Sequence, residues 1–238
     1  ISGSAAACRS WSSISAGRSR SRSIWSRAPP ARRDDATPGA ERGPMKLRND
    51  AESWGLIARL LHWSMAAIIV FMLVVGVYMT RIADDMVLRF GLTQTHKSWG
   101  FVVFALVFAR LGWRLAQPAA PEPPADTKPW EAVAARATHV GFYVLMALMP
   151  LTGWLMASAS PLNDEGAYPV QIKNRVFGLF ELPDPIAPGD ETLEAAFHAL
   201  HLAGAIALAA FLALHVGAAL KHHFVLRDGV LKRMVWGK

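Results

Sequence analysis

The chain has 238 residues, of which 53% are hydrophobic and 18% charged, and its formal net charge is +7. Soluble domains are on average less apolar and more charged, so the composition favours a membrane protein. The single cysteine, Cys8, excludes disulfides within the chain, iron–sulfur clusters and covalently attached c-type haem. Glycine-rich nucleotide loops and the HExxH zinc motif do not occur either, so any redox cofactor has to be held by other ligands, most readily histidines.

Residues 1–44 form a leader that we treat separately. It contains eight arginines and three acidic residues, is rich in Ser, Ala and Pro, and shows no apolar periodicity. Either Met45 is the true start and the leader is a gene-model artefact, which we prefer, or the leader resembles an organellar transit peptide. Because it has too little apolar surface to offset the entropy of ordering, we predict disorder. The arginines do not indicate nucleic-acid binding, and we expect no nucleic-acid partner.

Residues 45–238 contain four long apolar segments, which we expect to form one all-α domain. Each is close to the roughly 20 residues that a helix needs to cross a hydrocarbon core ~30 Å thick. A soluble bundle could not bury four helices that are apolar all round. We therefore predict a four-helix transmembrane bundle. Its helices are expected at about 54–80, 96–115, 138–158 and 197–220.

The loops between these segments differ in positive charge. Beyond the leader, one side of the predicted bundle carries 12 Lys and Arg residues and the other side carries 5. The positive-inside rule then places both termini and the second loop in the cytoplasm, in a bacterial inner membrane. The loop 159–196 lies outside, where it is acidic and rich in proline, with room for a short amphipathic segment near 176–182.

Six of the eight histidines lie in or at the edges of the predicted helices, where ionisable side chains are costly and usually functional. They are His62, His96, His139, His198, His201 and His215. On the fourth helix, His201 and His215 are 14 residues apart. That spacing corresponds to about 21 Å along the axis and to positions within roughly 40° of one face. His198 lies roughly 100° further round the helix and is the weaker candidate.

The histidines can also be matched by depth. His62 and His215 both lie near the cytoplasmic ends of their helices, and His96 and His201 both lie near the outer ends. Two such pairs suit two haems b with both axial positions filled, an arrangement that favours electron transfer over oxygen binding. The alternative is four unrelated histidines that make interhelical hydrogen bonds. His139 could bond a haem propionate, serve a quinone, contact lipid headgroups or act as a ligand.

Further residues have two interpretations each. Arg59 and Lys97 could pair with haem propionates or extend to the lipid headgroups. Gly76, Gly100, Gly153 and Gly204 could admit a porphyrin or only allow close helix packing.

Five sequence runs carry a resemblance to a known family. They are RLLHWSMA around His62, THKSWGF around His96, LMPLTGWLMASAS, VFGLFELP, and the closing HALHLAGAIALAAFLALHVGAALKHHFVLRDGVLKRM. Over roughly residues 50–236, the chain resembles the bacterial cytochrome b561 family and the related b-type subunits of nickel–iron hydrogenases. The leader has no counterpart in the family pattern.

The resemblance implies a four-helix protein that holds two haems b. Carried over by motif, it implies that His62, His96, His201 and His215 are the axial ligands of the haem iron. It also implies electron transfer across the membrane between quinone and an outer donor. A close bacterial relative is described as oxidising superoxide and reducing ubiquinone, so a superoxide:ubiquinone oxidoreductase is implied by resemblance alone.

Two other functions remain open at this stage. The chain could be a membrane-anchoring cytochrome b subunit that relays electrons for a hydrogenase or dehydrogenase, or a haem-free membrane protein such as a small transporter. Whether it is an enzyme depends on whether it turns over a substrate or relays electrons to a partner. The expected partners are membrane lipid, quinone, a redox partner protein and, as a homodimer, a second copy of the chain.

Overall fold

The computed structural model describes residues 46–117, 119–124, 127–164 and 173–237. The chain divides into two units, Ile1–Arg42 and Gly43–Lys238, and everything below concerns the second. The leader predicted at 1–44, with Cys8, lies outside the described residues.

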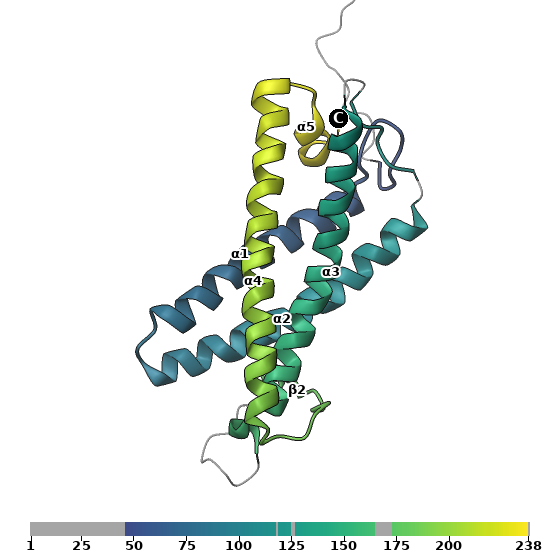
Figure 1. Cartoon of the computed structure of the whole chain (residues 1–238). Coiled ribbons are helices and arrows are strands. Elements are labelled where there is room, and N and C mark those ends of the chain that lie inside the picture. Colours follow the sequence, from purple (N-terminus) through teal and green to yellow (C-terminus); the bar gives the residue numbers. More distant parts are fainter. Residues whose placement is uncertain (1–45, 118, 125–126, 165–172, 238) are drawn as a thin grey trace, which may run out of the picture. The chain divides into compact units, whose positions relative to one another are not determined.

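Four long helices dominate the structure (Figure 1), and each is long and apolar enough to cross a membrane. Many large apolar side chains on them face outward, for example Val74, Leu148 and Leu214. Such exposure suits lipid rather than water, so the described chain is an all-helical, multi-pass membrane protein, as predicted. The long helices are α1 Leu56–Arg81, α2 Met86–Ala116, α3 Pro129–Ala159 and α4 Glu191–Leu220. The short elements are η1 Pro161–Asn163, β1 Arg175–Val176, β2 Phe180–Glu181, η2 Lys221–Leu226 and α5 Val230–Val235.

Three helices begin earlier than their apolar segments do. Helix α2 starts at Met86 rather than at 96, α3 at Pro129 rather than 138, and α4 at Glu191 rather than 197. The added turns contain many polar and charged residues, so hydropathy left them out. As a result, His96 lies inside α2 and does not open it.

Capping aspartates explain two of these early starts. The side chain of Asp85 accepts a hydrogen bond from the Leu88 backbone N–H at 2.7 Å, ahead of α2. Asp190 accepts from the Leu193 backbone N–H at 3.0 Å, ahead of α4. An N-cap of this kind stabilises a helix by about 1 kcal/mol and so favours a start at these positions.

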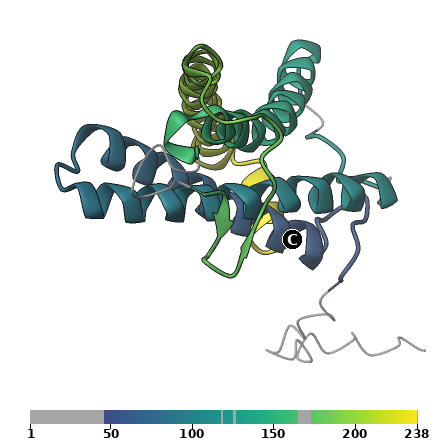
Figure 2. The same cartoon turned by 90° about the horizontal axis from the view of Figure 1, so that it is seen from below.

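The long helices pack in chain order. Helix α2 packs against both α1 and α3, and α3 lies alongside α4 (Figures 1 and 2). Among the described residues, these are the pairs of long helices with extensive backbone contact. A buried apolar cluster at mid-bundle joins all four helices: Met65, Ile69, Val107, Met146 and Leu208. Helix α4 therefore meets α1 and α2 through side chains rather than through close backbone packing.

One end of the bundle, which we call the α5 end, gathers the start of α1 and the C-terminal helix (Figure 1). The Arg59 guanidinium donates to the backbone carbonyl of Val235 at 2.6 Å, and the Trp63 indole donates to that of Met234 at 3.1 Å. These bonds join residues more than 170 positions apart. The arrangement agrees with an even number of membrane crossings, which returns the chain to its starting side.

The other end, which we call the hairpin end, carries the strands β1 and β2. They pair antiparallel, with Val176 opposite Phe180, in the region where a short amphipathic segment was expected. The hairpin lies beside α2 (Figure 2). The Ser98 hydroxyl of α2 accepts a hydrogen bond from the Phe177 backbone N–H at 2.8 Å, which attaches the hairpin to that helix.

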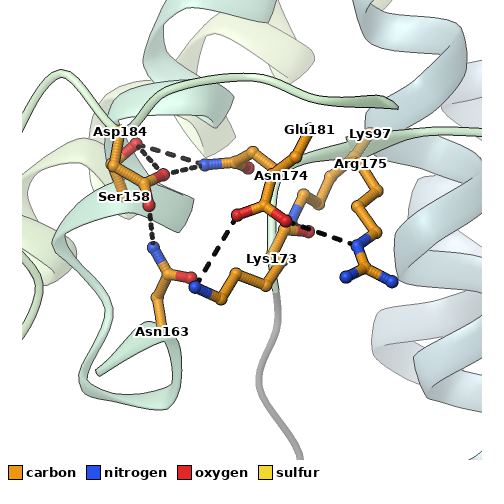
Figure 3. Close-up of polar contacts among 8 residues, drawn as sticks. All are labelled: Lys97, Ser158, Asn163, Lys173, Asn174, Arg175, Glu181 and Asp184. Carbon is orange, nitrogen blue, oxygen red and sulfur yellow. Dashed lines mark hydrogen bonds and ion pairs between the residues drawn. The ribbon is translucent and has the colours of Figure 1, made fainter. Parts of the chain in front are cut away.

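A polar cluster with buried donor residues closes the hairpin end (Figure 3). The Asp184 carboxylate accepts hydrogen bonds from the Asn174 amide at 2.5 Å, the Asn163 amide at 2.7 Å and the Ser158 hydroxyl at 3.1 Å. All three donor residues are at most 2% exposed. A single carboxylate thus fastens the C-terminal end of α3 to the connection that leads to α4.

We predict that Asp184→Ala destabilises this end of the bundle. The change removes the acceptor of the buried Asn163 and Asn174 amides, and each such loss costs about 1–3 kcal/mol. The thermal unfolding midpoint in detergent should fall, and proteolysis between α3 and α4 should become faster. Asp164→Ala is the matched control, because Asp164 is an exposed carboxylate of the same connection. Equal unfolding midpoints for the two variants would contradict the role given to Asp184.

Candidate functional site

Four of the predicted histidines form two facing pairs. The ring centroids of His62 on α1 and His215 on α4 are 6.1 Å apart, with ring planes at 55°. Those of His96 on α2 and His201 on α4 are 6.2 Å apart, with ring planes at 70°. Both pairs connect α4 to a helix with which, among the described residues, it shares no extensive backbone contact. The imidazoles therefore approach each other where the helix backbones do not.

Helix α4 sets the distance between the two pairs. It runs without interruption from Glu191 to Leu220, so His201 and His215 are separated by about 21 Å along its axis. Leu208 lies midway between them, is 5% exposed and belongs to the apolar cluster. One histidine pair thus lies on each side of an apolar layer.

The pair at the hairpin end is surrounded by small side chains and a hydroxyl. A Cβ added to Gly153 would lie 3.1 Å from Cε1 of His201, and one added to Gly76 would lie 3.4 Å from Cε1 of His96. The Thr152 hydroxyl lies 3.1 Å from Nδ1 of His201. Nδ1 of His96 is buried, with no hydrogen-bond partner in the described part of the chain. The rings of His201 and His96 therefore each lie beside a glycine, which has no side chain.

The pair at the α5 end has a cation beside it. Nη2 of Arg110 donates to Nδ1 of His62 at 3.1 Å. A guanidinium has no lone pair to offer, so Nδ1 of His62 accepts in this arrangement. Phe142 contacts the His215 ring edge-to-face, with centroids 5.4 Å apart. The two pairs thus differ in the polar group that meets their histidines.

The weaker candidates occupy different positions. His139 is exposed, although its ring centroid lies 5.8 Å from that of His215. It belongs to α3, which packs directly on α4 and leaves less room between the two helices. His198 is exposed. It is His201 that faces His96.

The histidines after α4 belong to a structural turn. His222 hydrogen-bonds the carboxylate of Asp228, which also accepts from the Val230 backbone N–H at 3.1 Å. Partial burial raises the pKa of Asp228, but these hydrogen bonds outweigh it and hold the pKa below its usual value. The carboxylate therefore stays ionised at neutral pH and keeps the turn closed.

The glycines singled out in the sequence divide into two kinds. Gly76 and Gly153 face histidine rings, whereas Gly100 and Gly204 face methionine side chains. The first two therefore make room at the hairpin-end pair, and the other two allow close packing.

The cations expected near propionates make contacts within the protein. Arg59 bonds the C-terminal backbone at Val235, and the Lys97 ammonium donates to the Lys173 carbonyl at 2.8 Å. In the sequence, Arg110 stands out only as one of the loop-side positive charges, and Thr152 does not stand out. A signal existed for Arg110, because it lies inside an apolar spanning helix. No such signal marked Thr152.

The donor set points to a particular class of protein. Among the described residues, no group of three or more His, Cys, Asp or Glu side chains could hold a bare metal ion. Two imidazoles on opposite sides can complete the coordination of a metal whose other ligands come from a planar macrocycle. Together with the spanning helices, this is the arrangement expected of a membrane-bound cytochrome of the b type, in which the haem has no covalent attachment.

Comparison with known proteins agrees with this class. Residues 53–237 match the prokaryotic cytochrome b561 family. Cytochrome b561 homolog 2 of Escherichia coli (strain K12) is 31% identical over 192 residues, which cover 80% of this chain and 95% of that protein. Cytochrome b561 homolog 1 of the same organism is 30% identical over 145 residues, which cover 60% and 73%. The chain belongs to the prokaryotic cytochrome b561 family, as its sequence runs predicted. It is a membrane-bound b-type cytochrome that functions in electron transfer.

The residues present fit haem b. An imidazole nitrogen binds a transition metal at about 2 Å and lies about 1.1 Å from its ring centre, so two axial imidazoles have centroids ~6 Å apart. The measured separations of 6.1 and 6.2 Å match that value. The glycines beside His96 and His201 leave room for a planar group at this pair.

We predict that Gly153→Ala lowers the haem bound per chain. The new Cβ would lie 3.1 Å from Cε1 of His201 and would push the ring out of line with His96. Haem quantitation and the reduced-minus-oxidised spectrum measure the effect. Gly112→Ala is the control, since a Cβ there meets nothing within 4 Å. Full haem content and an unaltered spectrum in Gly153→Ala would show that the glycine does not matter to the site.

Proposed function

We propose that this chain is a di-haem b cytochrome that carries electrons across the bacterial inner membrane between a quinone and an outer donor. The supporting observation is that two histidine pairs lie at different depths. Helix α4 contributes one histidine to each pair. Haem iron, which alternates between its ferric and ferrous states, supplies the one-electron chemistry when bound.

The proposal gives each pair one haem. His62 and His215 are the ligands at the α5 end, and His96 and His201 are the ligands at the hairpin end. With an imidazole on each side, these residues would leave the iron no open position for oxygen and would restrict the site to passing electrons. An ordinary edge-to-face ring contact has a similar centroid distance, so haem content decides between the two interpretations.

The surroundings of His62 imply that Arg110 would have to move when haem binds. Ligation through Nε2 requires the proton on Nδ1, where Arg110 now donates. Arg110 therefore has to release this nitrogen. A carboxylate is the partner that a guanidinium prefers, and haem b carries two.

The distribution of charge supports an orientation. The sequence places 12 Lys and Arg residues on the side of the α5 end and 5 on the side of the hairpin end. By the positive-inside rule, the α5 end and both termini lie in the cytoplasm. In this orientation His62 and His215 lie near the cytoplasm, and His96 and His201 lie near the outer surface.

Alanine variants of the four histidines test the di-haem proposal. We expect two low-spin haems b per wild-type chain. His96→Ala or His201→Ala should lose the haem of the hairpin end, and His62→Ala or His215→Ala should lose the other. Haem-to-protein ratios and redox titrations measure this. The controls are His198→Ala and His223→Ala, which should keep both haems. One haem or none in the wild type would sink the proposal.

Turnover by the isolated protein tests the finer assignment. A stand-alone superoxide:ubiquinone oxidoreductase should reduce a soluble ubiquinone analogue when superoxide is supplied, and His201→Ala should abolish this activity. Catalase and superoxide dismutase serve as controls for peroxide and for superoxide itself. If quinone reduction occurs only with a co-purifying dehydrogenase or hydrogenase, the chain is instead a membrane-anchoring relay subunit.

A further inference from the structure

The His201 ring contacts a hydroxyl on the neighbouring helix. Oγ1 of Thr152 on α3 lies 3.1 Å from Nδ1 of His201 on α4. The contact lies between two closely packed helices, and the ring is held on Gly153, the next residue of α3. His96 faces His201 at a centroid distance of 6.2 Å. The hydroxyl thus meets the ring nitrogen that iron would leave unused.

The direction of this hydrogen bond follows from the other contacts of the hydroxyl. Oγ1 of Thr152 also lies 2.9 Å from the Leu148 carbonyl and 3.0 Å from the Met149 carbonyl. Carbonyls only accept, so the single hydroxyl proton is directed to the helix backbone, as is usual for threonine within helices. The lone pairs of Oγ1 are then left for His201, and Nδ1 of His201 is the donor.

A neutral imidazole that carries its proton on Nδ1 has a free lone pair on Nε2. The hydrogen-bond network therefore assigns the proton of His201 to Nδ1 and the free lone pair to Nε2. This is the tautomer that an axial ligand requires, and it is present before any metal binds.

We propose that Thr152 is a positioning residue for the hairpin-end site, which fixes the tautomer of His201 and lowers the reduction potential of the haem bound there. This inference rests on the proposed di-haem function. A hydrogen bond from Nδ1–H makes the imidazole more basic and stabilises ferric iron more than ferrous iron. The group that the structure places beside Nδ1 of His62 is Arg110, which is a donor and not an acceptor. The lowering of the reduction potential is therefore expected at the hairpin-end haem only.

The test is a redox titration of the haem-loaded, full-length protein in detergent. Thr152→Val keeps the shape of the side chain but removes the acceptor, and Thr152→Ser keeps the acceptor. We expect Thr152→Val to raise the midpoint potential of the hairpin-end haem, identified as the component absent from His96→Ala. The other midpoint should stay in place. Thr152→Ser should restore the wild-type value, and the low-spin ferric electron paramagnetic resonance signal should shift in Thr152→Val alone.

Thr138→Val is the matched control. Its hydroxyl also bonds a carbonyl one turn earlier on α3, at 2.8 Å to Ala134, so it reports the effect of losing a threonine back-bond alone. Should Thr152→Val fail to accumulate, Thr152→Ala removes the same acceptor. Loss of the hairpin-end haem in Thr152→Val or Thr152→Ala, but not in Thr152→Ser, would also support positioning by this hydroxyl.

Two results would overturn the inference. One is an unchanged hairpin-end midpoint in Thr152→Val, and the other is a shift that Thr138→Val reproduces. Failure of the di-haem proposal would look different, because the wild-type chain itself would then hold fewer than two haems. The haem content of the wild-type chain therefore tests the di-haem proposal, and the midpoint potentials of the variants test the role of Thr152.

Discussion

The structure depends on imidazoles that meet at two depths of an apolar bundle. A polar ring inside a membrane is costly unless another group satisfies it, and one helix, α4, supplies a ring to each pair. The rise of an α-helix sets the distance between the pairs, because α4 runs unbroken from His201 to His215. The other helices then have one task in common, which is to bring His62 and His96 opposite these two positions.

The two pairs are not equivalent, and the difference lies in the groups behind the rings. At the hairpin end, glycine backbone and the Thr152 hydroxyl hold His201 in the tautomer that metal ligation needs. At the α5 end, Arg110 donates to His62 and has to leave before the same nitrogen can carry a proton. On the proposal that each pair binds a haem, the hairpin-end site is preorganised in the polypeptide, whereas the α5-end site would have to rearrange.

Both ends of the bundle are closed by contacts that reach far along the chain. Asp184 collects three buried donors at the hairpin end, and Arg59 and Trp63 hold the C-terminal backbone at the α5 end. Since α4 shares little backbone packing with α1 and α2, these closures and the mid-bundle apolar cluster keep the helices at fixed separations. These fixed separations hold the two histidine pairs in place.

The sequence by itself determined the number of spanning helices, the family, and the histidines that share a depth. These features are local, since hydropathy depends on neighbouring residues and helical rise converts residue spacing directly into depth. It did not locate the helix starts at Met86 and Glu191, because polar capped turns carry no hydropathy signal. Only the tertiary structure decided that Thr152 meets His201 and that Arg110 meets His62. These contacts join residues nearly fifty positions apart on different helices, and their geometry depends on how the helices pack and rotate against each other.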